Sequence, residues 1–351
     1  MGLRGRGRRG VAVLVASVVT AGLAGACRDS SDGPRVALLL PEGKAARYET
    51  KDRPYFQQRV KELCPSCRVT YANAGNNPAR QLSQVEAALA NRADVVVLDP
   101  VDARAARAAA IRAEEAGVPL IAYDRLIDDH RVDWYVGFDN AAVGRLQAAF
   151  LADAVTGRPG GVVMLHGAPS DPNAEEYRQG ATDELRRRGV TLVSEVAVED
   201  WNPGRARSEM ARALARKGTA GISGVYVAND AMASAAIDAF EEAGVAVPPV
   251  TGQDAELEAL HRIIDGRQAM TVYKPLREAA GRAAEAAVAF ASGGRPGPST
   301  GFAGKARVPA VVLQPAAVGP GDLTRVVTAD RFWLVAEVCA GRERRCAEEG
   351  L

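Results

Sequence analysis

Short apolar runs alternate with helical stretches along most of this chain, and this alternation constrains the fold more than any other feature. The run Arg35–Leu40 is almost continuously apolar, as is typical of strands buried on both faces of a parallel sheet. Further strands are expected over 69–72, 94–98, 118–123 and 134–138, with helices over 80–91 and 103–116. Strands joined through helices form parallel sheets covered on both faces, so the sequence predicts an α/β fold.

The same pattern begins again in the second half, with strands over 161–165, 192–198 and 222–228. Segment 109–118 is similar to segment 235–245, and in each case the next strand ends in an acid, Asp124 or Asp254. Ala/Glu-rich helices resemble one another without common origin, but the matching strand ends favour a duplication. We therefore expect two Rossmann-like lobes joined by a multi-strand hinge: 35–140 with 275–307, and 141–274 with 308–351.

The N-terminus has the pattern of an export signal. Four arginines precede an apolar, small-residue stretch over 11–26, which is too short for a comfortable membrane span. Cys27 follows directly, and this arrangement resembles a bacterial lipobox, although Ala24 stands where leucine is commoner. We expect residues 1–26 to be removed, Cys27 to be lipidated, and 27–34 to tether the protein to the outer face of the cell membrane. The alternative is a plain cleaved signal with an incidental cysteine.

Charge and the remaining cysteines bear on the compartment and the partners. Four of the 44 basic residues lie in the predicted signal, so the mature chain carries 40 against 43 acidic residues, which gives no electrostatic footprint for nucleic acid. Outside the cytoplasm, an even number of cysteines predicts disulfides, here two local ones. Cys64 follows a helical run, which favours a structural link over a redox motif. The four cysteines are Cys64, Cys67, Cys339 and Cys346.

Polar side chains gather at the predicted strand ends and in the loops after them. They are Arg47, Asp124, Arg125, Asn173, Asn229, Asp254 and Lys274, with the aromatic residues Tyr48 and Trp201 in nearby polar loops. Ligands of open α/β sheets bind beyond the carboxyl ends of the strands. Amide, carboxylate and cationic groups together satisfy hydroxyls, which both donate and accept.

Other interpretations of these residues stay open. Asp254 and Lys274 form a plain salt bridge in one, Trp201 belongs to the core in another, and Tyr48 is a packing residue in a third. The three histidines are scattered, and neither a phosphate-binding loop nor a serine nucleophile motif stands out. We therefore expect no metal, no cofactor and no enzymatic activity.

Several longer motifs carry a family resemblance over about residues 35–314. They include ARYETKDRPYF (46–56), YANAGNNPARQLSQVEAAL (71–89), IAYDRLI (121–127), YVGFDNAAVGRLQA (135–148), DPNAEEYRQG (171–180), EDWNPGRA (199–206), VANDAMASAAI (227–237), GQDAEL and MTVYKP. Together they resemble the type I periplasmic binding protein family, and within it the xylose-binding components of ABC importers. The resemblance implies sugar ligands at Arg47, Tyr48, Arg125, Asn173, Trp201, Asn229, Asp254 and Lys274, with Asp124 as a further contact.

Some positions depart from the family pattern. Tyr48 stands where tryptophan is common, the loop before it differs in length, and Pro172 replaces a polar residue beside Asn173. These departures bear on which sugar is bound more than on whether one is bound.

The resemblance implies a monomeric binding protein that captures a monosaccharide, with D-xylose first, by hinge closure and delivers it to a permease and ATPase complex. A sugar-responsive transcription regulator shares the fold, but it needs a helix-turn-helix where this chain has its signal. A sensor ectodomain that signals to a kinase is not separated from a transporter by sequence, and another pentose or hexose is the alternative ligand.

Overall fold

A computed structural model describes residues 1–2, 33–43, 45–324 and 331–351. The predicted signal beyond residue 2, Cys27 and nearly all of the tether lie outside these ranges. Within the described ranges no helix is both long and apolar enough to cross a membrane.

The first sheet has seven strands in the order β10-β11-β5-β4-β3-β1-β2 and is parallel except for β10. Its register places Val36 beside Val69 on one side and beside Val95 on the other, so that β1 lies between β2 and β3, and its residues Val36–Leu40 are buried. The strands are β1 Arg35–Leu40, β2 Arg68–Asn73, β3 Val95–Leu98, β4 Leu120–Tyr123, β5 Trp134–Phe138, β10 Gly301–Ala303 and β11 Val308–Leu313.

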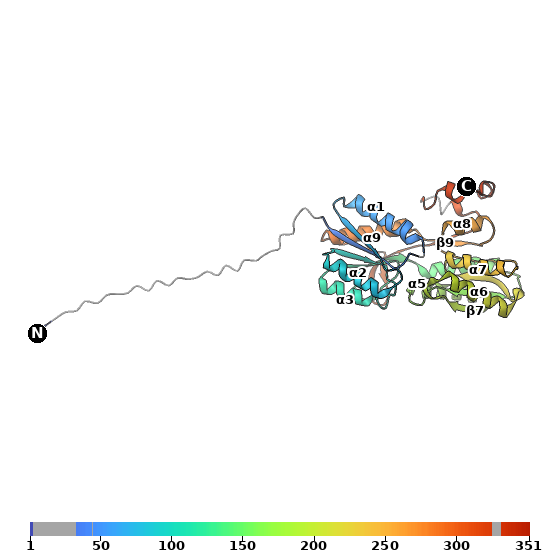
Figure 1. Ribbon diagram of the computed structural model, residues 1–351, viewed down its shortest axis with the longest axis horizontal. Coiled ribbons are helices and arrows are strands. Elements are labelled where there is room, and N and C mark those ends of the chain that lie inside the picture. The colour runs from blue at the N-terminus through green and yellow to red at the C-terminus, as the bar shows by residue number, and fades with distance from the viewer. Residues whose placement is uncertain (3–32, 44, 325–330) are drawn as a thin grey trace. The chain divides into compact units, whose positions relative to one another are not determined.

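Helices cover both faces of this sheet, as the alternation predicts (Figure 1). They are η1 Tyr48–Asp52, α1 Arg53–Leu63, α2 Pro78–Ala90, α3 Arg107–Ala116 and α9 Leu276–Ala291. One face packs against α1 and α9, and the other against α2 and α3, through two apolar clusters. We call this sheet with its helices the first lobe.

The second lobe is built around the parallel sheet β7-β6-β8 and the antiparallel pair β12-β9. Its strands are β6 Gly161–His166, β7 Leu192–Ala197, β8 Ile222–Val227, β9 Thr271–Tyr273 and β12 Ala316–Val318. Its helices are α4 Asn140–Ala154, α5 Pro172–Arg187, η2 Glu199–Trp201, α6 Pro203–Lys217, η3 Thr219–Gly221, α7 Asp230–Glu242, α8 Leu257–Ile264, α10 Val335–Val338 and α11 Glu343–Glu348. Bridges from Val250 to Val225 and from Thr251 to Met270 connect the two small sheets.

The mixed α/β class with mostly parallel sheets is confirmed, but one expected lobe boundary is wrong. Strand β11 was expected in the second lobe, which the sequence placed from residue 308 onward. It pairs with β5 in the first sheet, with Ala310 beside Tyr135. The chain therefore passes to the second lobe after Leu313, where β12 pairs with β9.

Two glycines bring helices α4 and α5 into close contact. A Cβ atom on Gly144 would lie 2.0 Å from the carbonyl oxygen of Tyr177, and one on Gly180 would lie 2.2 Å from that of Ala141. Only glycine permits this approach of two helix backbones. This close contact holds α5, whose first turn carries Asn173, against α4, which begins directly after β5.

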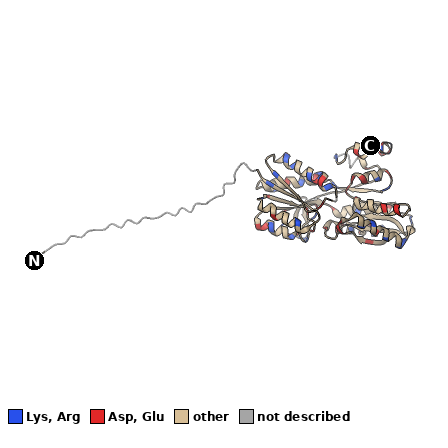
Figure 2. Cartoon of the chain, viewed as in Figure 1, with Lys and Arg blue, Asp and Glu red and all other residues tan. Residues whose placement is uncertain are grey.

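Both cysteine pairs lie beside helices, and Cys64 and Cys339 each directly follow one. The sulfur atoms of Cys64 and Cys67 are 2.03 Å apart, just after α1, and those of Cys339 and Cys346 are 2.14 Å apart, across α10 and α11. Charges of both signs are interspersed along the helices of both lobes (Figure 2), in keeping with the balanced totals of the sequence.

Candidate functional site

A pocket at the strand ends of both lobes contains all nine predicted ligand residues. It encloses about 550 Å³ of space not filled by atoms, part of it open to solvent. Its walls are Glu42, Ala45, Arg47, Tyr48, Asp124, Arg125, Asp171, Asn173, Tyr177, Trp201, Pro203, Asn229, Ala231, Gln253, Asp254 and Lys274. The residues predicted from the sequence therefore lie close together in space, although Arg47 and Lys274 are more than 200 positions apart.

The backbone bends sharply where two of the strands end. Asp124 directly follows β4 with φ 58°, and Asp254 follows the Val250–Thr251 strand segment with φ 100°. Side chains other than glycine rarely adopt positive φ, and such positions concentrate at functional sites. Ala255 also has a positive φ, of 50°, and α8 begins two residues later, at Leu257.

Arg47 is buried among carboxylates of the first lobe. Its Nε and Nη2 donate to the two oxygens of Asp52, each at 2.9 Å, and its Nη1 lies 2.7 Å from Asp124 Oδ2. Burial alone lowers the pKa of Arg47, but Asp124 and Asp52 outweigh it and raise that pKa well above its ordinary value. Burial likewise raises the pKa of Asp124, but the neighbouring cations, above all Arg47, bring it below its ordinary value. Both groups are therefore charged.

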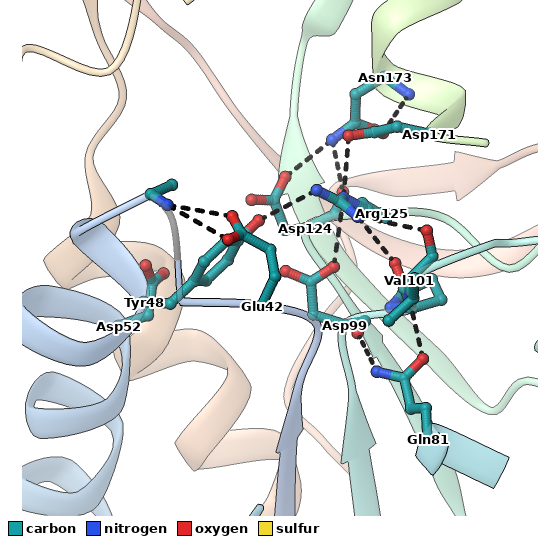
Figure 3. A network of polar contacts seen from close by, with 12 residues as sticks. Glu42, Tyr48, Asp52, Gln81, Asp99, Val101, Asp124, Arg125, Asp171 and Asn173 are labelled. Atoms are coloured by element: carbon teal, nitrogen blue, oxygen red, sulfur yellow. Dashed lines mark hydrogen bonds and ion pairs between the residues drawn. The ribbon is translucent and has the colours of Figure 1, made fainter. Parts of the chain in front are cut away.

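Arg125 joins the first lobe to the second (Figure 3). Its Nε lies 2.9 Å from Asp171 Oδ2, which belongs to the loop before α5. Its Nη1 donates to the carbonyl of Pro100 at 3.1 Å, and its Nη2 donates to the Tyr48 hydroxyl at 3.4 Å. The guanidinium plane is thus held at the pocket wall, and Tyr48 is 4 % exposed beside it.

The second lobe supplies amides and aromatic rings. We expected Asn173 in a loop, but it lies in the first turn of α5. Its Nδ2 donates to Asp124 Oδ1 at 2.8 Å. Asn229 caps α7 by accepting from the Met232 amide, which leaves its own NH₂ group to other partners. Trp201 lies in η2 against Gly167, and its buried indole N–H has no partner among the described residues.

Lys274 and Asp254 close the pocket between the lobes. Lys274 Nζ lies 2.9 Å from Asp254 Oδ1, yet the angles do not satisfy a hydrogen bond, so that oxygen has no hydrogen-bond donor among the described residues. Arg47 Nη1 is 4.0 Å from the same oxygen. The salt bridge considered in the sequence analysis is therefore present. It lies in the pocket wall, where Asp254 Oδ1 can still accept a hydrogen bond.

Several residues in or beside the pocket were not predicted as site residues. Asp52 and Asp171 hold the two arginines, Tyr177 stacks edge-on with Trp201 at 6.5 Å, and Gln253 has a buried, unpaired Oε1. Asp99 lies behind Arg125, 3.7 Å from its Nε, and burial raises the pKa of Asp99 well above its ordinary value. The motif GQDAEL contains Gln253, and the motif DPNAEEYRQG contains both Asp171 and Tyr177, so these three were within reach of sequence analysis.

The chemistry of this pocket is that of binding. Among the described residues, no cluster of three or more His, Cys, Asp or Glu side chains is arranged to hold a metal ion. The walls combine fixed donors and acceptors with aromatic faces, which suits a neutral ligand with many hydroxyls.

Comparison with known proteins agrees with this geometry. Residues 36–295 match the periplasmic binding protein domain. The D-xylose-binding periplasmic protein of Escherichia coli is 32% identical over 310 residues, which are 87% of this chain and 92% of that protein. A multiple sugar-binding periplasmic protein of Azospirillum brasilense is 28% identical, over 87% of this chain and 92% of its own.

A solved structure extends the comparison to three dimensions. A carbohydrate transporter solute-binding protein from Chloroflexus aurantiacus, in complex with D-glucose, is 30% identical and superposes with a TM-score of 0.79, covering 86% of this chain and 97% of its own. The similarities span both lobes. The chain therefore belongs to the periplasmic binding protein family, as an extracytoplasmic sugar-binding protein of ABC transporters, and it is not an enzyme.

Proposed function

We propose that the pocket binds one monosaccharide, with D-xylose as the first candidate, and that the nine predicted residues are its ligands. The observation that carries the proposal is that all nine, from both lobes, line one pocket. The fit to xylose is supported by the similarity to two D-xylose-binding periplasmic proteins, each 32% identical to this chain. D-glucose is the second candidate, because the similar Chloroflexus protein was solved with it.

The proposed contacts follow from the donors and acceptors on the walls. Asp254 and Asp124 accept from hydroxyls, while Arg125, Lys274 and the Asn229 amide donate. Trp201 and Tyr48 cover the apolar C–H faces of the ring. A hydroxyl donates once and accepts twice, so paired acidic and cationic groups satisfy it fully.

The contacts between lobes support closure around the sugar as the binding mechanism. Asn173 and Asp171 of the second lobe already reach Asp124 and Arg125 of the first. Asn76 donates to Asp200 at 3.1 Å at another crossing point. A sugar held by both sets of residues binds the closed form better than an open one, and this differential affinity shifts the equilibrium.

Calorimetric titration tests the function directly. We expect one of xylose, glucose, ribose and arabinose to bind the mature protein with one-to-one stoichiometry and a dissociation constant at least about tenfold below the others, a difference of about 1.4 kcal/mol. Mannitol serves as a non-cyclic control. If none of the four sugars gave a binding heat, this result would contradict the proposal.

We also propose that Cys27 is lipidated and anchors the protein to the outer face of the membrane. The expected result is that Cys27→Ala moves the protein from the membrane fraction to the soluble extracytoplasmic fraction, because the acyl chains supply the membrane affinity. Ser30→Ala, in the same tether, is the matched control and should stay with the membrane. Membrane association of the Cys27→Ala protein would show that another feature holds it there.

Further parts of the proposal concern partners and covalent links. The protein acts as a monomer that delivers its sugar to a permease and ATPase complex, and the two cysteine pairs form disulfides in the oxidising compartment. The lobe division, with the boundary moved to Leu313, assigns four of the nine proposed ligands to the first lobe and five to the second.

A further inference from the structure

The C-terminal segment 331–351 packs beside α8, next to the sugar pocket's Asp254 turn (Figure 1). Arg342 Nη2 lies 2.9 Å from Asp265 Oδ2, and Arg345 Nη1 lies 2.7 Å from Asp265 Oδ1. His261 on α8 lies 3.1 Å from the carbonyl of Glu337. These contacts, with the Cys339–Cys346 pair, hold the segment in position on the second lobe.

In this position, Trp333 contacts the turn that contains Asp254. Its indole Nε1 donates to the carbonyl of Ala255 at 2.8 Å. Asp254 and Ala255 both have positive φ, a conformation that costs free energy and needs support from its surroundings. Thr271 supports the turn from one side by accepting from the Ala255 amide at 3.2 Å, and Trp333 supports it from the other.

The same tryptophan also contacts the first lobe. Lys51 Nζ lies 3.7 Å from the centre of the Trp333 ring and donates to the carbonyl of Phe332 at 2.5 Å. Lys51 belongs to η1, which begins at Tyr48 and ends at Asp52, the partner of Arg47. A cation over an indole face is the most favourable arrangement of this kind.

We infer that Trp333 is a positioning residue of the sugar site, which clasps the η1 turn of the first lobe to the Asp254 turn of the second. Trp333 is not among the residues that line the pocket. It fixes instead the two backbone segments that carry Arg47 and Tyr48 on one side and Asp254 on the other. The inference rests on the proposed function, because the positions it fixes are those of the proposed ligands.

Two conservative substitutions test the clasp from opposite lobes. Trp333→Phe keeps an aromatic ring over Lys51 but removes the N–H group that holds Ala255, and Lys51→Met keeps the apolar stem but removes the ammonium. Each is expected to weaken sugar binding in calorimetry by about fivefold to tenfold, the scale of one lost hydrogen bond or cation–ring contact. Leu334→Ala, at an exposed neighbour of Trp333, and Lys61→Met, at an exposed position of α1, are the controls and should bind as the wild type does.

The unfolding temperature without sugar separates positioning from a purely structural role. Calorimetry reports on folded protein, so a merely structural residue lowers the unfolding temperature and leaves affinity unchanged. Unchanged affinity in both variants, with wild-type protein binding its sugar, overturns the inference. A wild-type protein that binds no sugar contradicts the proposed function instead, and the inference falls with it.

Discussion

Asp254→Asn is expected to weaken sugar binding by about 1.5–3 kcal/mol, the range for hydrogen bonds to a charged group. Asp254 Oδ1 is buried beside Lys274 Nζ, 2.9 Å away, and has no hydrogen-bond donor among the described residues, so a sugar hydroxyl is its expected partner. The amide variant keeps the shape of the side chain and removes the charge. Calorimetric titration with the sugar that the wild type binds measures the loss directly.

The control for this variant is Asp183→Asn. Asp183 lies on the exposed side of α5 and pairs only with its helix neighbour Arg186, both more than half exposed. It should bind sugar as the wild type does. Because Asp254→Asn also leaves Lys274 buried without its carboxylate, unfolding without sugar is measured alongside. An Asp254→Asn protein that is folded and retains wild-type affinity would remove Asp254 from the ligand set.

Arg47→Met should lower the free energy of unfolding of the sugar-free protein by about 3–5 kcal/mol. Arg47 is 6 % exposed and neutralises both Asp52 and Asp124, which are 1 % and 3 % exposed. Removal of one member of a buried ion pair leaves an uncompensated charge, and losses of this size are usual. Denaturant unfolding of the two proteins measures the difference, with sugar affinity as a second readout.

Arg53→Met serves as the matched comparison. Arg53 pairs with Glu49 on the surface, with both side chains 39% exposed, and exposed pairs contribute at most about 1 kcal/mol. The two arginines are only six positions apart, so the comparison isolates burial. Equal, small losses in both variants would show that the Arg47 cluster tolerates its unpaired carboxylates.

The fold, and the convergence of the nine predicted residues on one pocket, were predictable because they depend on local patterns. Apolar runs in the sequence indicate the strands, and the carboxyl ends of parallel strands form the edge of the sheet where ligands bind. Because strands and helices alternate, these ends lie close together in the fold. The nine residues therefore met in one pocket without any knowledge of distances. Matching acids after the two equivalent strands, Asp124 and Asp254, also share the positive φ that their position requires.

Features that depend on pairing between distant segments could not be predicted from the sequence. Strand β11 is as short and apolar as a strand of either lobe, and only its register beside β5 assigns it to the first. Asp99 looks like an ordinary acid at a strand end until the fold places Arg125 3.7 Å from it. The clasp through Trp333 depends on a contact between residues 282 positions apart, which no periodicity records.

The ion pairs of the pocket carry a consequence for which solutes it admits. Arg47, Arg125 and Lys274 each lie against a carboxylate, and the acids of the cleft outnumber these three cations. A phosphorylated sugar or a sugar acid would bring a negative charge into a space that is already electrically balanced or negative, at a high desolvation cost. We therefore expect anionic sugars to bind more weakly than the neutral sugar of the same ring, because the wall charges discriminate against them in addition to the contacts with the ring.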